Sequence, residues 1–249
     1  MCKARCRIPS AEYFRKLHKA DYCLFNAALV YTPSQFFTNL VKRDFSDLAV
    51  RTNTNGILDS MFTKGEKSRS NKIRFGYFGG RDLVKGYFLM RKVLQSYNQS
   101  KFDLVLIDTA SRGEPGPMSH DGWGNNVTIH GYTQHDKMVD IYRSIDVLLF
   151  PSFWKESFGL MVREAIANDV FIISSDCGGP REAIIPGKNG LTFAMGDERG
   201  FRECVDYVLA HEKEILNYKT TEYGDVRTFA EQAKELISDY DSIIQGNEK

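Results

Sequence analysis

The stretch that decides the fold runs from residue 146 to residue 174 and reads DVLLFPSFWKESFGLMVREAIANDVFIIS. Its two ends, DVLLF (146–150) and VFIIS (170–174), are mostly apolar runs of five residues. Runs of this kind are typical of strands that are buried on both faces of a parallel sheet. Between them the pattern predicts a helix that begins near Ser157 and ends at about Asn168. The stretch therefore predicts one strand–helix–strand unit.

The same alternation continues on both sides of this unit. Further strands are predicted at KIRFGYF (72–78), FDLVLI (102–107) and VTIHGY (127–132), and further helices at FLMRKVLQSY (88–97), HDKMVDIYRSI (135–145) and RGFRECVDYVLAH (199–211). Strands that alternate with helices at this spacing predict an α/β fold with a Rossmann-like, doubly wound parallel sheet. The strand-to-helix loops of such a sheet all emerge at its carboxyl edge, where ligands bind.

The flanking regions predict a division of the chain into three parts. Residues 1–65 contain only two short strand patterns, which cannot close a sheet, so they are interpreted as the end of a preceding domain. Residues 66–210 hold the alternating pattern. Residues 211–249 end in a long amphipathic stretch, 226–244, whose apolar face must pack on another part of the molecule.

Composition limits the classes of function. Of 249 residues, 42% are hydrophobic and 12% aromatic, which is typical of a globular protein with a core. The formal net charge of +1 offers no broad positive field, so nucleic acid is not expected as a partner. Five cysteines, an odd number, favour reduced thiols in a cytoplasm, and none of their spacings matches a metal site. The longest apolar runs are too short to span a bilayer.

Two carboxylates flank the start of the predicted helix. Glu156 precedes a Ser-Phe-Gly turn, and Glu164 follows it, about 10 Å further along if the intervening residues are helical. A helix N-terminus attracts phosphate oxygens, and Gly159 leaves room for a ligand there. Carboxylates accept paired hydrogen bonds from vicinal hydroxyls. The arrangement predicts a nucleoside diphosphate sugar, with its diphosphate between the two carboxylates.

The diphosphate also needs positive charge. GGRDLVKG (79–86), at the first strand-to-helix turn, offers Gly79 and Gly80 for close approach and Arg81 and Lys85 as cations. These cations can neutralise the diphosphate, so no metal ion and no other cofactor are expected.

These motifs together resemble a known family. ESFGLMVRE (156–164) resembles the E-x7-E signature of retaining GT-B glycosyltransferases, specifically glycosyltransferase family 4 (group 1). Other landmarks follow in the family's order: GGR…KG, HGY…IYRSIDVLLFPS and DCGGPREAI…GKNGLTF. The resemblance covers nearly all of residues 24–210 and mainly concerns the family's C-terminal, donor-binding domain. VYTPSQFFTNLV and RTNTNGILDSMF resemble the end of the N-terminal, acceptor-binding domain and the hinge, and the last helix is expected to pack back toward that domain.

The resemblance implies a role for each matching residue. Glu164 would hold the ribose hydroxyls, and Glu156 would lie near the donor sugar as part of the catalytic set. Lys85 and Arg81 would stabilise the departing diphosphate, although family members commonly have one more residue between these two cations. The remaining donor contacts would come from Gly79 and Gly80, from the base-reading loop at Gly131 and Tyr132, and from the backbone amides of Phe158, Gly159 and Leu160.

The implied activity is retaining, metal-independent transfer of a sugar from a UDP-, GDP- or ADP-sugar to a glycan or lipid-linked acceptor, in polysaccharide or glycoconjugate synthesis. The expected location is the cytoplasm or the inner face of a membrane. One alternative is a non-catalytic half that binds the nucleotide sugar and needs a partner chain, or a missing segment, for the acceptor domain. A nucleotide-sugar epimerase or a pyridoxal phosphate-dependent phosphorylase would keep the fold and change the chemistry.

Overall fold

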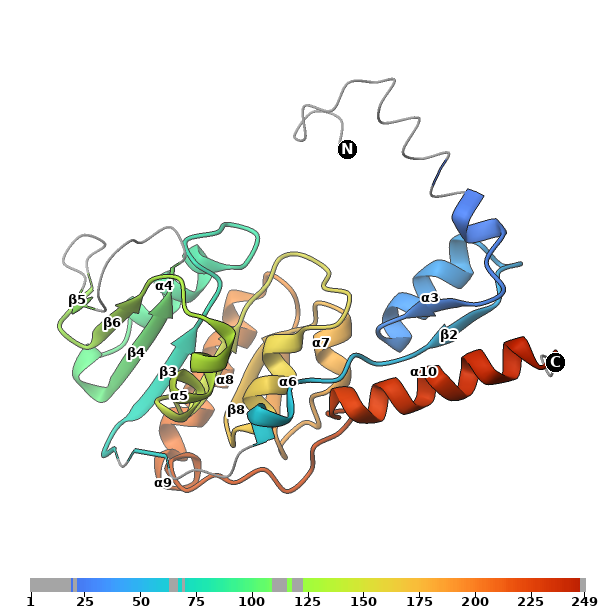
Figure 1. The fold of residues 1–249 in the computed structure, drawn as a ribbon. Coiled ribbons are helices and arrows are strands. Elements are labelled where there is room, and N and C mark those ends of the chain that lie inside the picture. Colours follow the sequence, from blue (N-terminus) through green and yellow to red (C-terminus); the bar gives the residue numbers. More distant parts are fainter. Residues whose placement is uncertain are drawn as a thin grey trace.

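The computed structural model describes residues 19, 22–62, 67–68, 70–108, 116–117 and 123–246. Figure 1 shows a large unit built around one sheet and a small unit that contains β1, α3 and β2. The last helix, α10, extends from the large unit along the small one. The chain thus runs from the small unit into the large unit and returns at its end.

The large unit contains a seven-stranded sheet in the order β5-β6-β4-β3-β7-β8-β9. Every neighbouring pair is parallel except β5 with β6. The order reverses at β3, because the chain first builds outward through β4 and β6 and then returns to β7 on the other side. This confirms the predicted doubly wound parallel sheet. The strands are β3 (Ile73–Tyr77), β4 (Phe102–Ile107), β5 (Gly116–Pro117), β6 (Val127–His130), β7 (Val147–Phe150), β8 (Phe171–Ser175) and β9 (Gly190–Phe193).

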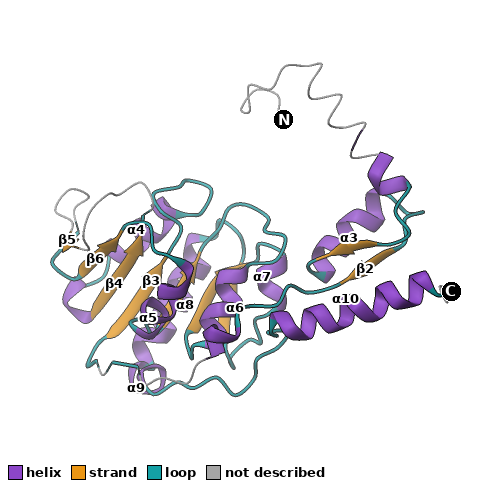
Figure 2. Cartoon of the chain, in the orientation of Figure 1, coloured by secondary structure: helices purple, strands orange, loops and turns teal. Residues whose placement is uncertain are grey.

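Helices cover both faces of this sheet (Figure 2). Side chains alternate along each strand, so Val147 and Leu149 of β7 lie in one core cluster while Leu148 lies in the other. The first cluster packs under α4 (Tyr87–Gln95), α8 (Glu198–Ala210) and α9 (Glu212–Leu216). The second packs under α5 (Met138–Arg143), α6 (Leu160–Ala167) and the short α7 (Gly179–Glu182). Short 3-10 turns lie at η1 (Asp59–Phe62), η2 (Gln99–Lys101) and η3 (His135–Lys137).

Three elements differ from the sequence-based expectation. The helix expected from Ser157 begins at Leu160, because Gly159 has a φ of +83° and a left-handed residue interrupts the helical backbone. The short helix α7 was not predicted, and Pro180 lies in its first turn. The strand β9 in GKNGLTF was not predicted, since the segment has few of the β-branched residues that mark strands.

In the small unit, β1 (Val30–Thr32) pairs in parallel with β2 (Val50–Thr52), and α3 (Gln35–Asp44) connects them. The helix α10 (Phe229–Ile244) is held to these strands by hydrogen bonds. Tyr31 donates to the Asp239 carboxylate at 2.6 Å, and the Gln232 amide donates to the Asn53 side chain at 3.0 Å. The last helix therefore packs on the small unit. Much of the N-terminal segment predicted to end a preceding domain, residues 1–18 among it, lies outside the described residues.

Two crossings of the chain join the units, and they pair with each other. The Ile57 amide donates to the Arg227 carbonyl at 2.8 Å, and the Phe229 amide donates to the Ile57 carbonyl at 3.1 Å. A Cβ added at Gly56 would lie 2.4 Å from the Thr228 carbonyl, so only glycine allows this approach. We call this pairing the double hinge.

None of the helices within the described ranges is long and apolar enough to cross a membrane. Cys23, Cys177 and Cys204 are free thiols, and Cys2 and Cys6 lie outside the described residues.

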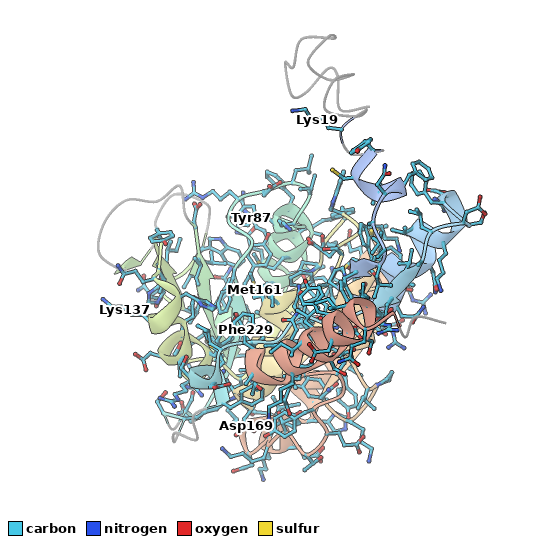
Figure 3. The ribbon with its side chains drawn as sticks, turned by 45° about the vertical axis from the view of Figure 1, so that its right-hand side comes forward. Lys19, Tyr87, Lys137, Met161, Asp169 and Phe229 are labelled. Atoms are coloured by element: carbon cyan, nitrogen blue, oxygen red, sulfur yellow. The ribbon has the colours of Figure 1, made fainter. Side chains whose placement is uncertain are left out.

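At the amino edge of the sheet, one lysine has a partly buried ammonium group. Lys67 donates from Nζ to the carbonyl of Asp169, which Figure 3 labels near the bottom of the view, well below Tyr87. Arg74 already forms a two-pronged ion pair with the buried Asp146 carboxylate, at 2.7 and 2.8 Å. Burial of Lys67 lowers its pKa to about 8, although Asp146 and Asp169 act in the opposite direction.

This pKa predicts how stability changes with pH. Below about pH 8, Lys67 is protonated in the folded and unfolded chains, and folding carries the full cost of burying its charge. That cost disappears as pH rises toward about 10.4, the pKa of an unperturbed lysine. We therefore expect the unfolding free energy of the wild type, relative to Lys67→Met, to rise by about 2 kcal/mol across this window. Denaturant unfolding at several pH values measures it. The exposed Lys188, changed to Met, is the control, and a pH-independent difference for Lys67→Met would refute the assignment.

Candidate active site

A pocket lies at the carboxyl edge of the sheet, where β3 and β7 end side by side. The strand order reverses at this point, and doubly wound folds bind ligands at such a crevice. The pocket has a volume of about 180 Å³. Figure 3 labels one of its residues, Met161 of α6. Its lining combines the first loop with the end of β7 and the start of α6: Tyr77, Phe78, Gly79, Gly80, Asp82, Lys85, Leu149, Phe150, Ser152 and Met161.

Lys85 and Glu156 meet at this pocket. The Lys85 ammonium donates to Oε1 of Glu156, and the two side chains are 38% and 19% exposed. The buried Ser152 hydroxyl lies 3.5 Å from the same carboxylate oxygen. The first loop and the loop after β7 are in close contact nearby. A Cβ at Gly86 would lie 2.0 Å from the carbonyl oxygen of Pro151. An anion that enters the pocket would meet the Lys85 ammonium there, paired with the Glu156 carboxylate.

The N-terminus of α6 lies beside this pair. Gly159 caps the helix with no side chain to bond its first amides, and the first turn carries no acidic residue. The positive end of the helix is therefore not neutralised by its own sequence, which favours an anion there. Phe158 is buried below the turn, and Leu160 is 43% exposed. Although the helix begins later than expected, the amides of Phe158, Gly159 and Leu160 still lie at its start.

Glu164 lies one turn into α6 and is buried. Its carboxylate accepts a hydrogen bond from the Tyr142 hydroxyl at 2.7 Å and lies 2.7 Å from Nε2 of His135. Burial raises the pKa of Tyr142, and the negative charge of Glu164 raises it further, so this phenol remains a donor. The His135 side chain is 52% exposed. The sequence did not single out Tyr142 or His135, because neither lies at a spacing that points to Glu164.

Arg163 is a further residue that the sequence did not reveal. Its side chain is fully buried, its guanidinium pairs with the Asp225 carboxylate, and it donates to the carbonyls of Phe158 and Gly179. The guanidinium also stacks 3.4 Å from the centre of the Phe158 ring. Burial lowers the pKa of Arg163 and Asp225 counteracts this, so the ion pair keeps the charge in place. Arg163 fixes the loop before α6 from inside.

The two predicted cations lie in different surroundings. Arg81 is 43% exposed, and its Nε lies 3.3 Å from Asp108 at the end of β4. Both of these residues line a smaller pocket next to the main one. Gly79 and Gly80 line the main pocket; Gly80 has a φ of +60° and donates from its amide to the Ile107 carbonyl at 3.0 Å. Lys85 thus joins Glu156, whereas Arg81 is turned toward β4.

The predicted base-reading loop follows β6 at the same edge. Tyr132 is 77% exposed, and the carbonyl of Gly131 accepts a hydrogen bond from the Thr133 hydroxyl at 3.3 Å. The end of β6 is joined to the end of β4, since the Asp108 amide donates to the His130 carbonyl at 2.9 Å. Main-chain atoms of this loop are thus available at the carboxyl edge.

Within the residues that the structure describes, no group of three or more His, Cys, Asp or Glu side chains could hold a metal ion. The sequence contains one D-x-D pattern, Asp239 to Asp241, in α10. Asp239 is bound there by Tyr31 and Arg51. Both of these residues lie on the small unit and not at the pocket. Metal independence remains a prediction.

Known proteins resemble the chain in sequence and in fold. An N-acetylgalactosaminyltransferase of Campylobacter jejuni that acts on N,N'-diacetylbacillosaminyl-diphospho-undecaprenol is 28% identical over 123 residues, covering 49% of this chain and 32% of the relative. Sucrose-phosphate synthase from Thermosynechococcus elongatus has a TM-score of 0.73 at 18% identity, over 93% of this chain and 62% of that one. Anabaena HepE in complex with UDP-glucose has a TM-score of 0.72 at 16% identity, over 89% and 66%. The chain spans about a third of the length of that curated relative.

Residues 62–227, more than half of the chain, match the sequence model of a family described as glycosyl transferases group 1. The matched region contains the whole parallel sheet, the pocket, and all the predicted site residues. The chain therefore belongs to the family of group 1 glycosyl transferases.

Proposed function

We propose that this chain is a retaining glycosyltransferase of family 4, or the donor-binding part of one, which transfers a sugar from a nucleoside diphosphate sugar to a glycan or lipid-linked acceptor. The observation that carries the proposal is the pairing of Lys85, which lines the pocket, with Glu156 beside the open N-terminus of α6. A cation and a helix N-terminus suit a diphosphate, and a carboxylate suits sugar hydroxyls.

The mechanism follows from where charge develops. When the sugar leaves the donor, negative charge grows on the diphosphate, and groups that already point at it lower the barrier. Lys85 supplies one full charge, and the first-turn amides of α6 supply hydrogen bonds and a partial positive charge. Arg81 would have to turn from Asp108 to contribute. With these cations no metal ion is required, so we expect the reaction to be metal-independent.

The carboxylates would position the two sugars of the donor. Glu164 has two acceptor oxygens that His135 and Tyr142 engage in the unliganded chain, and ribose hydroxyls would replace the exposed His135 ring while Tyr142 keeps the carboxylate in place. Glu156 would exchange its bond to Lys85 for one to a hydroxyl of the transferred sugar. Main-chain atoms at Gly131 and Tyr132 would contact the base.

For the donor base, the sugar and the acceptor, we propose chemical classes only. HepE is described in complex with UDP-glucose, and the Campylobacter relative transfers N-acetylgalactosamine to an undecaprenyl-linked acceptor. A hexose or its N-acetylamino derivative on a uridine, guanosine or adenosine diphosphate fits this range, in polysaccharide or glycoconjugate synthesis. A lipid-linked acceptor would bring the chain to the inner face of a membrane.

A second candidate function is donor binding without transfer by this chain alone. The alignment covers 32% of the Campylobacter relative, and the names of the curated relatives, which are transferases, do not favour this candidate. In this case an acceptor-binding partner, on another chain or segment, would complete the enzyme. Sugar transfer by the isolated chain would exclude this candidate.

Donor binding gives the first test. We expect at least one of UDP, GDP and ADP to bind the chain in isothermal titration, and Glu164→Gln to weaken that binding by about 10- to 100-fold, because hydrogen bonds to a carboxylate are lost. Glu203→Gln on the exposed face of α8 should bind as the wild type does. If none of the three nucleotides binds, or Glu164→Gln binds equally well, the proposal is wrong.

Turnover gives the second test. In an enzyme that includes the acceptor-binding part, Lys85→Ala should lower kcat by about 100-fold, because a preorganised charge at the leaving group is removed. Nucleoside diphosphate release from the donor measures this rate. Lys92→Ala removes an exposed lysine of α4 that pairs with Glu198 and serves as the control. An unchanged kcat in Lys85→Ala would show that the charge acts elsewhere.

A further inference from the structure

The first turn of α3, in the small unit, is bonded to the loop before α6 and to α7 of the large unit. The Ser34 hydroxyl donates to the carbonyl of Ser157, in the loop before α6, at 2.6 Å. The amides of Gln35 and Phe36 donate to the two carboxylate oxygens of Glu182 in α7, the first at 3.0 Å. We call these contacts the α3 clamp.

The clamp uses the chemistry of a helix start. The first turn of α3 contains no acidic residue, so Glu182, from a distant part of the sequence, supplies the negative charge that a helix N-terminus favours. Ser34 is fully buried and accepts a hydrogen bond from the Phe37 amide at 3.1 Å as the helix cap. The same hydroxyl donates its hydrogen bond to the Ser157 carbonyl. One hydroxyl therefore caps α3 and holds the loop of the other unit.

Phe36 extends the clamp by packing. A Cβ at Gly178 would lie 2.5 Å from the Phe36 ring, so the ring rests on a glycine backbone, and the Lys155 ammonium lies 5.6 Å from the ring centre. Gly178 forms a bridge with Glu156. In that bridge, the Glu156 amide donates to the Cys177 carbonyl at 2.7 Å, and the Gly179 amide donates to the Glu156 carbonyl at 2.9 Å.

These contacts enclose the backbone of Glu156 on two sides. Ser34 holds the residue that follows Glu156, and Phe36 and Glu182 hold the segment to which Glu156 is paired. The Glu156 side chain points to Lys85 in the pocket. The position of the small unit is therefore transmitted to a carboxylate of the pocket through three residues that do not line it.

We propose that Ser34 and Glu182 are positioning residues, which hold the Glu156 loop in its donor-binding geometry only while the small unit is docked. The inference rests on the proposed function for the part of Glu156 in donor binding, but the clamp itself is independent of any donor. Rotation of the small unit about the double hinge would open the clamp and release the loop. The small unit thereby controls the donor site without contacting the donor.

Amide hydrogen exchange of the whole chain, followed by mass spectrometry, tests the clamp directly. Ser34→Asp separates its two roles, because an aspartate caps a helix well but has no proton to donate to the Ser157 carbonyl. Ser34→Thr keeps both roles. Glu182→Ala removes the carboxylate, and Glu182→Gln keeps its volume without the charge, in case the alanine variant folds poorly.

We expect Ser34→Asp, Glu182→Ala and Glu182→Gln to speed exchange in residues 155–160 and 177–179 by about fivefold, the effect of losing one hydrogen bond. Exchange in β3 and β4 should not change, which excludes a general loss of stability. Ser34→Thr and the controls Glu203→Ala and Ser242→Ala should match the wild type. Unchanged exchange of these loops in both Ser34→Asp and Glu182→Gln would overturn the inference.

Affinity for UDP, GDP or ADP, whichever binds the wild type, gives the second measurement. Ser34→Asp and Glu182→Gln should weaken binding of the matching nucleotide sugar more than binding of the nucleoside diphosphate, since Glu156 is placed at the sugar. Equal losses for both ligands would contradict a role through Glu156. If no nucleotide binds the wild type, the proposed function fails, whereas the exchange experiment still decides whether the clamp exists.

Discussion

The ion pair between the buried Arg163 and the partly exposed Asp225 is the interaction on which the geometry of the site depends. The guanidinium bonds the carbonyls of Phe158 and Gly179, so it joins the loop before α6 to the start of α7. Asp225 brings the segment that leads to the double hinge into the same contact. Removing one partner of a buried pair leaves an uncompensated charge, at a cost of about 3–5 kcal/mol. The pocket loop, the α3 clamp and the hinge therefore share one electrostatic anchor.

The charged side chains of the site are paired with groups of the protein itself. Lys85 and Glu156 bond each other, and Glu164 accepts from Tyr142 beside the ring of His135. A ligand would exchange partners with these groups rather than supply missing ones, so little uncompensated charge is created at any stage. This explains how a buried carboxylate and a pocket lysine coexist in a stable fold. It also explains why the amino edge differs, where Lys67 has no carboxylate hydrogen bond among the described contacts and its pKa is lowered.

The sequence predicted five of the seven strands of the sheet, because buried parallel strands have a strong pattern. FDLVLI matches β4 at both ends, and DVLLF and VFIIS match β7 and β8 within one residue. It was also sufficient to bring Lys85 and Glu156 to one edge, since strand-to-helix loops must meet there. It failed at the start of α6, where the backbone of Gly159 and not a side-chain pattern sets the boundary. It also failed for Arg163, Glu182 and Ser34, whose partners are distant in sequence and leave no local periodicity. The role of each site residue in binding or catalysis remains a prediction.

The double hinge has a mechanical consequence. Two backbone segments connect the units, and because Ile57 is hydrogen-bonded to Arg227 and Phe229, neither can slide past the other. A single linker would let one unit rotate about several axes relative to the other. Two paired linkers restrict this rotation mainly to one axis, which runs through the double hinge. Both ends of the described chain lie on the small-unit side of the double hinge (Figure 1). A pulling force between the two ends of the described chain would therefore act first on the contacts between α10 and β1. The seven-stranded sheet would bear the force only after those contacts break.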